Sequence, residues 1–419
     1  MHRVGQIALF LGIFIAIIGG VHFYIWIRLI HATSLPAPWS RVATIAVLIL
    51  GLSLPATFLL SRALPESVAR AVLFVPYLWM GMMFLFFFFL LATDVLRALT
   101  SLGLWASGHT DLLAAAGRRV LVARVLAGTV MLAVAGCSVV AVHTALARPV
   151  VREVRVELPH LPASMSGFTI VQLTDLHVGP TLGEKWLRGV VGEVNALRPD
   201  LVAITGDLVD GSVPQLRAAV APIGELKAPH GVFFITGNHE FYSGVGPWLA
   251  ELRRLGVQVL ENERVAISRG AQVTDGAFDL AGVHDYSAHT VGNGHYRADL
   301  PKALAGRDPT RALVLLAHQP RAARQAAELG VGLQLSGHTH GGQIWPWRYL
   351  VYLQQPWVSG RHRVGATTLY VSDGTGFWGP AMRLGTSAEI TRVTLVAPAG
   401  GTGKQGDGET GSKAGLKSR

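Results

Sequence analysis

The first third of the chain contains four long stretches without a charged residue, and they constrain the fold more than any other feature. They cover residues 7–27, 42–60, 71–93 and 125–147. A helix needs about 20 predominantly apolar residues to cross a bilayer, whereas a buried helix of a soluble domain seldom has more than about 14 in succession. The sequence therefore predicts a transmembrane region of four helices within residues 1–147.

The topology of this region is only partly readable. Residues 7–27 exceed the apolar core of about 7–15 residues that a signal peptide has, and no convincing cleavage site follows them, so a membrane span is favoured. Four crossings place both chain ends on one side of a cell membrane, in a multi-pass arrangement. The basic residues are shared almost equally between the two sides, so the positive-inside rule leaves the orientation undecided. The semi-apolar segment 94–119 either lies in the interface or extends the third helix.

The charge distribution argues against nucleic acid as a partner. The sequence has a net charge of +10, but residues 148–397 contain 23 basic and 21 acidic side chains and are nearly balanced. A nucleic-acid-binding protein carries its basic excess on the folded domain. The single cysteine, Cys137, excludes a disulfide within one chain and leaves the redox compartment open.

From residue 148 onward, short apolar runs alternate with helix-like stretches, which is typical of an α/β domain. Strands are expected over 169–173, 201–205, 231–236, 312–317, 333–336, 368–372 and 389–396, with a hairpin in 264–284. Helices are expected over 184–197, 214–226, 247–255 and 321–329. We expect 148–164 to be a linker and 165–397 to be the folded domain. The glycine-rich residues 398–419 should form a flexible tail, because they offer little apolar surface.

Side chains of the kinds that bind metal ions follow five of the predicted strands. In chain order the seven are Asp175, His177, Asp207, Asn238, His318, His338 and His340. Because the carboxyl ends of strands in a layered sheet share one edge, we expect these side chains to converge. Mixed imidazole and oxygen ligands favour Zn, Fe or Mn over Mg or Ca. The set is large enough for two ions that keep open coordination positions.

The order Asp-x-His, Gly-Asp-x-x-Asp, Gly-Asn-His-Glu, His and Gly-His-x-His resembles the signature of the calcineurin-like metallophosphoesterases. The resemblance covers roughly residues 165–397. Residues 237–242 and 375–380 look most like the bacterial subgroup whose catalytic domain follows membrane or export segments. The resemblance implies an α/β fold with two β-sheets sandwiched between helices, and a metal-dependent phosphoric ester hydrolase.

Carried over residue by residue, the resemblance implies a binuclear metal centre in which Asp207 bridges two ions. The first ion would be held by Asp175, His177 and His340. The second would be held by Asn238, His318 and His338. The same ligands accept Mn, Zn and Fe, so the identity of the metals stays open.

The resemblance also implies a catalytic pair that does not bind metal. His239 would face the phosphate and assist the leaving oxygen, and Asp210 would orient His239, as carboxylates orient imidazoles elsewhere. A hydroxide held between the ions would attack phosphorus in line. Whether the substrate is a monoester or a diester is not readable.

Two stretches are candidates for substrate selection. Five aromatic residues between 345 and 357 precede Arg361 and Arg363. Because Trp and Tyr prefer the membrane interface and Arg meets anionic headgroups, this loop is either a bilayer contact near the metals or a packed hairpin. Arg383 either contacts phosphate or belongs to a structural loop.

Two interpretations of function follow. The favoured one is a membrane-anchored phosphoesterase of the cell membrane, with phospholipids or lipid-linked phosphates among the candidate substrates. The alternative is a membrane sensor or transporter whose phosphoesterase domain is a metal-dependent binding module. The complete ligand set and the scarcity of polar residues in the spans disfavour the alternative.

Overall fold

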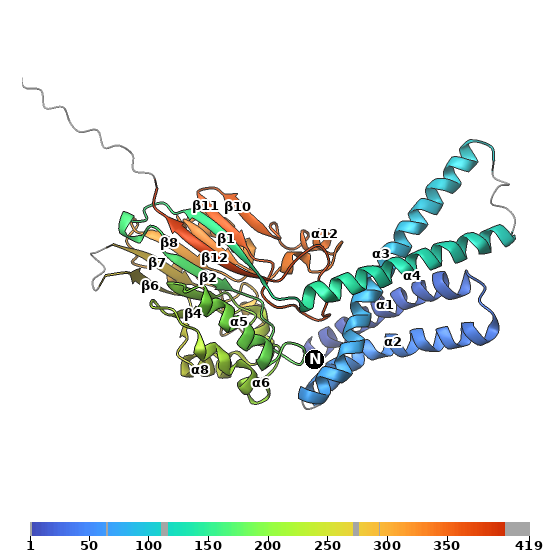
Figure 1. The fold of residues 1–419 in the computed structure, drawn as a ribbon, viewed down its shortest axis with the longest axis horizontal. Helices are drawn as coiled ribbons and strands as arrows, with labels where there is room; N and C mark the ends of the chain where they lie inside the picture. Colours follow the sequence, from blue (N-terminus) through green and yellow to red (C-terminus); the bar gives the residue numbers. More distant parts are fainter. Residues whose placement is uncertain (1, 64–65, 110–115, 271–275, 293, 399–419) are drawn as a thin grey trace, which may run out of the picture.

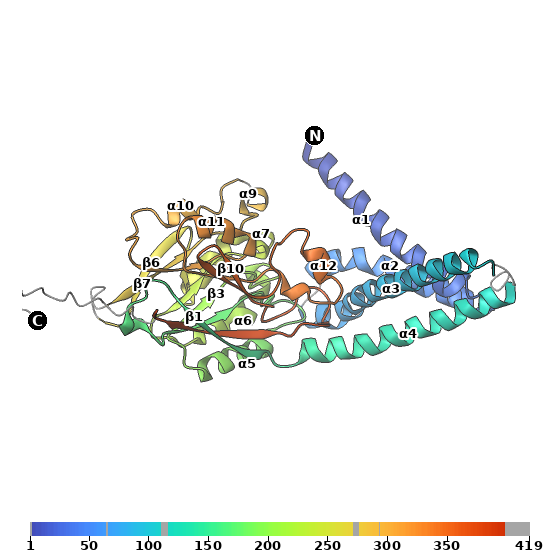
Figure 2. The same cartoon turned by 90° about the horizontal axis from the view of Figure 1, so that it is seen from above.

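The computed structural model describes residues 2–63, 66–109, 116–270, 276–292 and 294–398 (Figure 1). Four long helices lie at one end of the molecule, and a mixed α/β domain lies at the other (Figures 1 and 2). The long helices are α1 (His2–Trp26), which continues as the π-helical turn η1 (Ile27–His31), α2 (Ala37–Ala63), α3 (Glu66–Ala106) and α4 (Ala116–Leu146).

Each long helix contains a segment that is long and apolar enough to cross a membrane. These segments are Gly12–His31, Ala37–Thr57, Ala71–Ala106 and Gly117–Leu146. The third has 36 residues, and at 1.5 Å per residue it is about 54 Å long, well beyond a hydrocarbon core of about 30 Å. The helix α3 therefore tilts strongly or extends past the hydrocarbon. Of the semi-apolar segment 94–119, residues up to Ala106 extend this helix.

Polar side chains within the helical region pair with one another. Asp94 on α3 lies 2.8 Å from the Arg28 guanidinium, and its carboxylate accepts a hydrogen bond of 2.6 Å from the Tyr24 hydroxyl. The Trp79 indole donates to Nε2 of His22 at 2.9 Å. These contacts hold α1 to α3, so the side chains have structural partners within the bundle.

Two six-stranded sheets form the centre of the α/β domain. The first has the order β1-β12-β2-β3-β4-β5, and the second has the order β10-β11-β9-β8-β7-β6. The strands of the first sheet are β1 (Val150–Glu157), β12 (Glu389–Val396), β2 (Thr169–Leu173), β3 (Leu201–Ile204), β4 (Val232–Phe234) and β5 (Gln258–Val259). Those of the second are β10 (Gly360–Val364), β11 (Thr367–Val371), β9 (Leu333–Ser336), β8 (Ala312–Leu316), β7 (Ala277–Gly282) and β6 (Glu263–Ser268).

Helices cover the outer faces of both sheets, which gives the two-sheet α/β sandwich that the resemblance implied (Figure 2). On the first sheet these are α5 (Glu184–Ala196), α6 (Val213–Val220) and α8 (Val245–Arg254), and on the second they are α10 (Leu300–Ala303) and α11 (Ala323–Glu328). The short helices α7 (Asn238–Ser243), α9 (Ala288–Val291) and α12 (Arg348–Val351) lie in connecting segments. Short helical turns complete the set: η3 (Ala163–Met165), η4 (Ala221–Glu225), η6 (Pro320–Ala322) and η7 (His340–Gly342).

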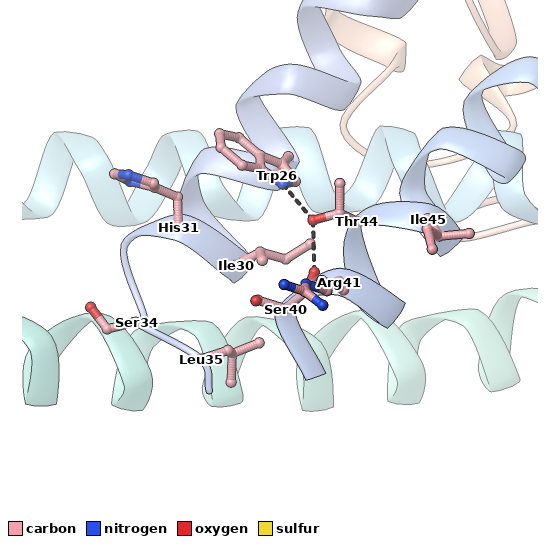
Figure 3. A pocket seen from close by; sticks show the side chains of 9 residues that line it. All are labelled: Trp26, Ile30, His31, Ser34, Leu35, Ser40, Arg41, Thr44 and Ile45. Carbon is pink, nitrogen blue, oxygen red and sulfur yellow. Dashed lines mark hydrogen bonds between the residues drawn. The ribbon is translucent and has the colours of Figure 1, made fainter. Parts of the chain in front are cut away.

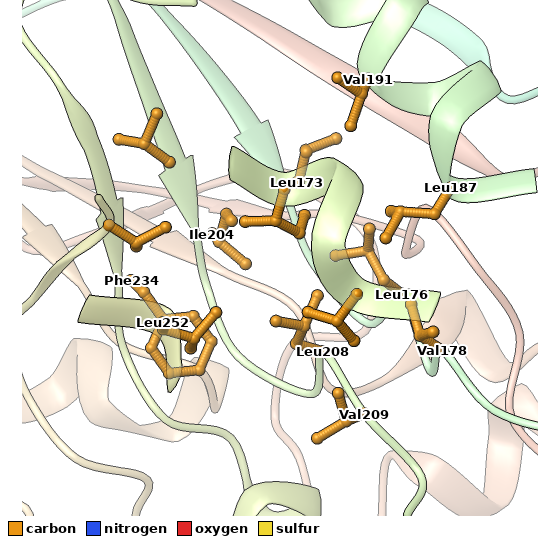
Figure 4. Packing of buried hydrophobic residues seen from close by; sticks show 14 of the residues in the cluster. Leu173, Leu176, Val178, Leu187, Val191, Ile204, Leu208, Val209, Phe234 and Leu252 are labelled. Carbon is orange, nitrogen blue, oxygen red and sulfur yellow. The ribbon is translucent and has the colours of Figure 1, made fainter. Parts of the chain in front are cut away.

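Two apolar clusters hold the layers together. Between the sheets, Phe168 and Phe233 pack with Phe278 and Leu335. On the outer face of the first sheet, side chains of β2, β3 and β4 pack against α5, α6 and α8 (Figure 4). The strands β2, β3, β4 and β5 run parallel, as do β7, β8, β9 and β11, so each sheet brings its carboxyl ends to one edge.

The structure corrects one predicted boundary. Residues 148–164, expected to be a linker, contain β1, which pairs in parallel with β12 along its full length. As an edge strand it is mostly solvent-exposed and carries charged residues, so its sequence lacks the apolar run of a buried strand. Residues 399–419, the predicted tail apart from Pro398, lie outside the described residues.

Candidate metal centre

The structure brings all nine predicted site residues together at the carboxyl ends of the central strands. Asp175 and His177 follow β2, and Asp207 and Asp210 follow β3. The other strands supply Asn238 and His239 at the start of α7, His318 after β8, and His338 and His340 after β9. Loops from both sheets therefore build the site, and most of these side chains are buried.

Asp175, His177 and His340 form one group, whose potential ligand atoms all lie within 4.8 Å of one another. The Nε2 atoms of the two imidazoles are 3.1 Å apart, and Nε2 of His340 is 3.5 Å from Oδ1 of Asp175. Nδ1 of His177 is 3.0 Å from Oδ1 of Asp210. When Nδ1 carries the proton, the lone pair of Nε2 points at the other ligands, which is the usual arrangement of a metal-binding histidine.

Asp207, His318 and His338 form a second group of the same kind. Oδ2 of Asp207 is 3.1 Å from Nε2 of His318, 3.9 Å from Nε2 of His177 and 4.0 Å from Nε2 of His239. This one oxygen therefore lies between the two groups. Although burial opposes the shift, the facing imidazoles hold the pKa of Asp207 well below its usual range.

The polar atoms of the second group fit a cation. Nδ1 of His318 lies 2.8 Å from the carbonyl oxygen of Thr205, to which it donates when protonated, and this leaves Nε2 as the free lone pair. Oδ1 of Asn238 is buried and has no hydrogen-bond partner among the described residues. Because an unpaired buried carbonyl is costly, and because the next residue, His239, donates its backbone N–H to Asp207, this amide oxygen is a further candidate metal ligand.

His239 lies at the rim of this arrangement and contacts Asp210. Its Nδ1 is 2.6 Å from Oδ1 of Asp210, the same oxygen that contacts His177. Burial lowers the pKa of His239, but the charges of Asp207 and Asp210 outweigh burial and raise it to about 9. The sequence predicted that Asp210 orients His239, and the structure adds His177 as a second partner of that carboxylate.

The backbone around the candidate ligands is strained. Five of them have positive φ angles: Asp175, His177, Asp207, His338 and His340. Left-handed backbone is uncommon for residues with a side chain and clusters at functional sites. The packed strands that flank these loops hold the unfavourable conformation, and the side chains converge as a result.

Two glycines each let one loop of the site approach a neighbouring loop closely. A Cβ atom on Gly237 would overlap Oδ1 of Asp207, and a Cβ atom on Gly337 would overlap Oδ2 of Asp175. We expect Gly237→Ala to displace Asp207 and to lower metal affinity by about 10- to 100-fold, as loss of a supporting contact does at other metal sites. Titration with Mn²⁺ checks this expectation. The matched control is Gly189→Ala on α5, whose added Cβ meets no atom of the described residues within 4 Å.

Sequence reasoning assigned no role to Glu240, the last residue of the Gly-Asn-His-Glu motif. Its carboxylate accepts hydrogen bonds from the backbone N–H groups of Asp207, Leu208 and Gly237. Burial and the charge of Asp207 raise the pKa of Glu240 to about 7, while the N–H groups of Gly237 and Leu208 oppose the rise. The sequence did contain a signal for this role, because a glutamate three residues after the residue that caps a helix often accepts a hydrogen bond from the backbone of that cap.

The side chain of Arg383 is fully buried, which favours the second of the two alternatives, a structural role in its loop. The guanidinium donates to the carbonyl oxygens of Asp373 at 2.7 Å and His340 at 3.4 Å. Its backbone N–H donates to the carbonyl oxygen of Ala141 on α4 at 2.8 Å. Arg383 therefore connects a candidate metal ligand to a long apolar helix.

A separate cleft lies where η1 meets the start of α2 (Figure 3). It is lined by Trp26, Ile30, His31, Ser34, Leu35, Ser40, Arg41, Thr44 and Ile45. The Trp26 indole donates to the Thr44 hydroxyl at 2.9 Å across it. This cleft shares no residue with the candidate metal centre and lies at the end of the helices away from the α/β domain (Figure 1).

Known proteins resemble both parts of the chain. The model of the family described as "Calcineurin-like phosphoesterase" matches residues 168–342. A "Transmembrane protein with metallophosphoesterase domain" from Danio rerio is 34% identical over 382 residues, which cover 89% of this chain and 85% of the relative. A protein of the same description from Bos taurus is 46% identical over 266 residues, covering 62% of this chain and 60% of the relative.

The resemblance extends to bacteria. An uncharacterized metallophosphoesterase of Bacillus subtilis (strain 168) is 32% identical over 244 residues, covering 56% of this chain and 81% of the relative. Since similar proteins occur in vertebrates as well, the likeness is not confined to the bacterial subgroup. The chain belongs to the calcineurin-like phosphoesterase family, as a member in which four long apolar helices precede the phosphoesterase domain.

Proposed function

We propose that the protein is a membrane-anchored phosphoesterase that hydrolyses phosphoester bonds at a centre of two metal ions. The observation that carries this proposal is the position of Asp207. Its Oδ2 atom lies between the group of Asp175, His177 and His340 and the group completed by His318 and His338. A single carboxylate between two sets of imidazole and oxygen ligands is suited to bridging two ions.

Each residue of the site has a part in this proposal. Asp175, His177 and His340 would hold one ion, Asn238, His318 and His338 would hold the other, and Asp207 would join them. Two bound ions supply an activated water and neutralise the phosphate oxygens during in-line displacement.

His239 and Asp210 would act on the leaving group. His239 is hydrogen-bonded to Asp210 through Nδ1, which leaves Nε2 free to carry a proton. Nε2 would donate this proton to the departing oxygen, and Asp210 would hold the imidazole in the orientation that the transfer needs. The Nε2 atom lies 4.0 Å from Oδ2 of Asp207, so it faces the position where the two ligand groups meet.

The proposed substrates are phospholipids or lipid-linked phosphates. The support is the connection between the site and the apolar helices, since the backbone of Arg383 bonds to α4 while its side chain bonds to His340. Phe377 and Ala381, from the same loop, pack against Ala145 on α4. This attachment of the site to the long apolar helices supports a substrate that comes from the bilayer.

The experiment uses the full chain, loaded with Mn²⁺ in lipid nanodiscs, and assays a bis-aryl phosphate, a mono-aryl phosphate and a phospholipid beside the Asn238→Ala variant. We expect metal-dependent turnover in the wild type and a loss of about 100-fold or more in the variant, because one ion loses its amide ligand. The ratio of the turnover rates on the two aryl phosphates indicates whether the site prefers a diester or a monoester. A wild-type protein that binds two ions per chain and hydrolyses neither aryl phosphate nor phospholipid would instead support a binding module.

A further inference from the structure

An exposed aromatic surface lies beside the candidate metal centre. We call residues 345–353 the aromatic segment; it includes α12, and none of the side chains of α12 is buried. Leu353 is 82% exposed, Tyr349 is 62% exposed, and Trp345 and Trp347 are each 47% exposed. A soluble domain seldom gathers so many large apolar side chains at its surface without a partner.

The aromatic segment continues directly onto α3. The Trp347 ring meets the Phe84 ring edge-on, with the ring centroids 5.2 Å apart. Ile344, just before the segment, belongs to one buried apolar cluster with Met382 and with Trp79 of α3. The surface is thus continuous with a helix that is apolar enough to cross a membrane.

The helix lengths place this contact at the level of a membrane surface. The part of α3 after Phe84, residues 85–106, is about 33 Å long at 1.5 Å per residue, close to the thickness of a hydrocarbon core of about 30 Å. On α4, Ala141 binds the loop of Arg383 and lies near the end of the helix that leads into the α/β domain. Both helices therefore meet the domain about one bilayer thickness from their far ends.

The same region borders the reacting groups. The centroids of the Trp378 and His239 rings are 5.9 Å apart. The backbone carbonyl oxygen of Trp378 accepts a hydrogen bond of 2.9 Å from the side chain of Gln343, which lies two residues before the aromatic segment. From α3, Tyr77 is close enough to Asp210 for an electrostatic interaction. Because Tyr77 and Phe84 are seven residues apart, they share a helix face, and this face runs from the site to the aromatic segment.

Three residues that follow the aromatic segment, Trp357, Arg361 and Arg363, do not belong to this surface. Trp357 packs against Leu369 and Val371 of the second sheet. Arg361 and Arg363 hydrogen-bond to the backbone oxygens of Arg155 and Gly365. The surface therefore depends on aromatic and aliphatic side chains, which suit the boundary between headgroups and acyl chains.

We propose that the aromatic segment docks into the lipid bilayer beside α3 and holds the mouth of the phosphoesterase site at the headgroup layer. This rests on the proposed function and adds to it the surface through which a phosphoester in a lipid headgroup reaches His239. The lipid bilayer is the occupant because the segment is continuous with a candidate membrane span at the level where that span leaves the hydrocarbon.

The test places a fluorophore on the segment of the full chain. In a Cys137→Ala background, Leu353→Cys is labelled with an environment-sensitive dye, and the protein is reconstituted in phosphatidylcholine–phosphatidylglycerol vesicles. Ala266→Cys on β6, an exposed position at the far end of the domain, is the matched control. We expect nitroxide-labelled lipids to quench the dye at residue 353 and to leave the dye at residue 266 unquenched.

Two results would overturn the proposal. Equal quenching at the two positions would mean that the segment does not enter the bilayer. A dye at residue 353 that is shielded from water yet not quenched by labelled lipids would mean that a protein partner or a second copy covers the segment. Neither result depends on activity, so a failure of docking can be distinguished from a failure of the proposed function.

A second measurement separates docking from chemistry. We expect Tyr349→Glu combined with Leu353→Glu to lower kcat/KM for a vesicle phospholipid about tenfold, because two side chains lose their burial in lipid. Turnover of a soluble aryl phosphate should be unchanged, since neither side chain belongs to the metal centre. An equal loss on both substrates would contradict a docking role and would indicate structural damage.

Discussion

Asp207→Asn is expected to cause the largest loss of activity of any single substitution that keeps the shape of the site. The variant removes the negative charge that faces His177, His239 and His318 at 3.9, 4.0 and 3.1 Å. We expect kcat/KM on an aryl phosphate to fall by about 10³-fold, which corresponds to about 4 kcal/mol of transition-state stabilisation. The number of metal ions bound per chain, measured by mass spectrometry after buffer exchange, should fall in parallel.

The matched control for this substitution is Asp308→Asn. Asp308 is an exposed carboxylate that accepts hydrogen bonds from the backbone N–H and the hydroxyl of Thr310, two residues later. We expect the control to keep wild-type turnover and metal content. An Asp207→Asn protein that is folded, carries two ions per chain and turns over at the wild-type rate would refute the bridging role.

His239→Gln is expected to have the second largest effect, and its signature differs from that of a metal ligand. Loss of a positioned general acid lowers kcat by about 10²- to 10⁴-fold, while the predicted metal ligands all remain in place. We expect the loss to be larger for phenyl phosphate than for p-nitrophenyl phosphate, because the poorer leaving group needs the proton more. Steady-state kinetics on the two esters, together with metal analysis, checks both parts of the expectation.

His289→Gln serves as the control, since His289 is exposed on α9 and contacts Tyr286 and Thr290. This control should turn over both esters at the wild-type rate. If His239→Gln lowered kcat on the two esters by the same factor and lowered the metal content as well, His239 would be acting on the metal centre and not on the leaving oxygen.

The buried strands could be predicted from sequence because their apolar runs have the length of a strand. The predicted ranges of β2 and β9 agree with the structure residue for residue, and β3 and β8 differ by one residue at one end. The edge strands β1 and β10 and the two-residue strand β5 were missed. The two edge strands carry charged side chains and lack an apolar run, and β5 is too short to form a pattern, so only their pairing with other strands defines them.

The predicted site residues come together because each follows a strand whose end lies at the same edge of a sheet. Their roles as metal ligands and acid remain predictions. What the sequence could not give is the support for these residues. The hydrogen bonds that Glu240 accepts from Asp207 and Leu208, and those of the buried Arg383 guanidinium, join loops that are far apart in the chain. Local pattern carries no information about such partners.

The strand order of the first sheet has a consequence for how the protein is made. The strand β12, the last among the described residues, lies between β1 and β2, so the sheet cannot close until residues 389–396 have left the ribosome. Until then β2 presents an unpaired edge, while the four apolar helices have already been synthesised. Unpaired edges of this kind make folding intermediates prone to aggregate. A chain truncated before β12 would keep its membrane segments but would leave the first sheet open.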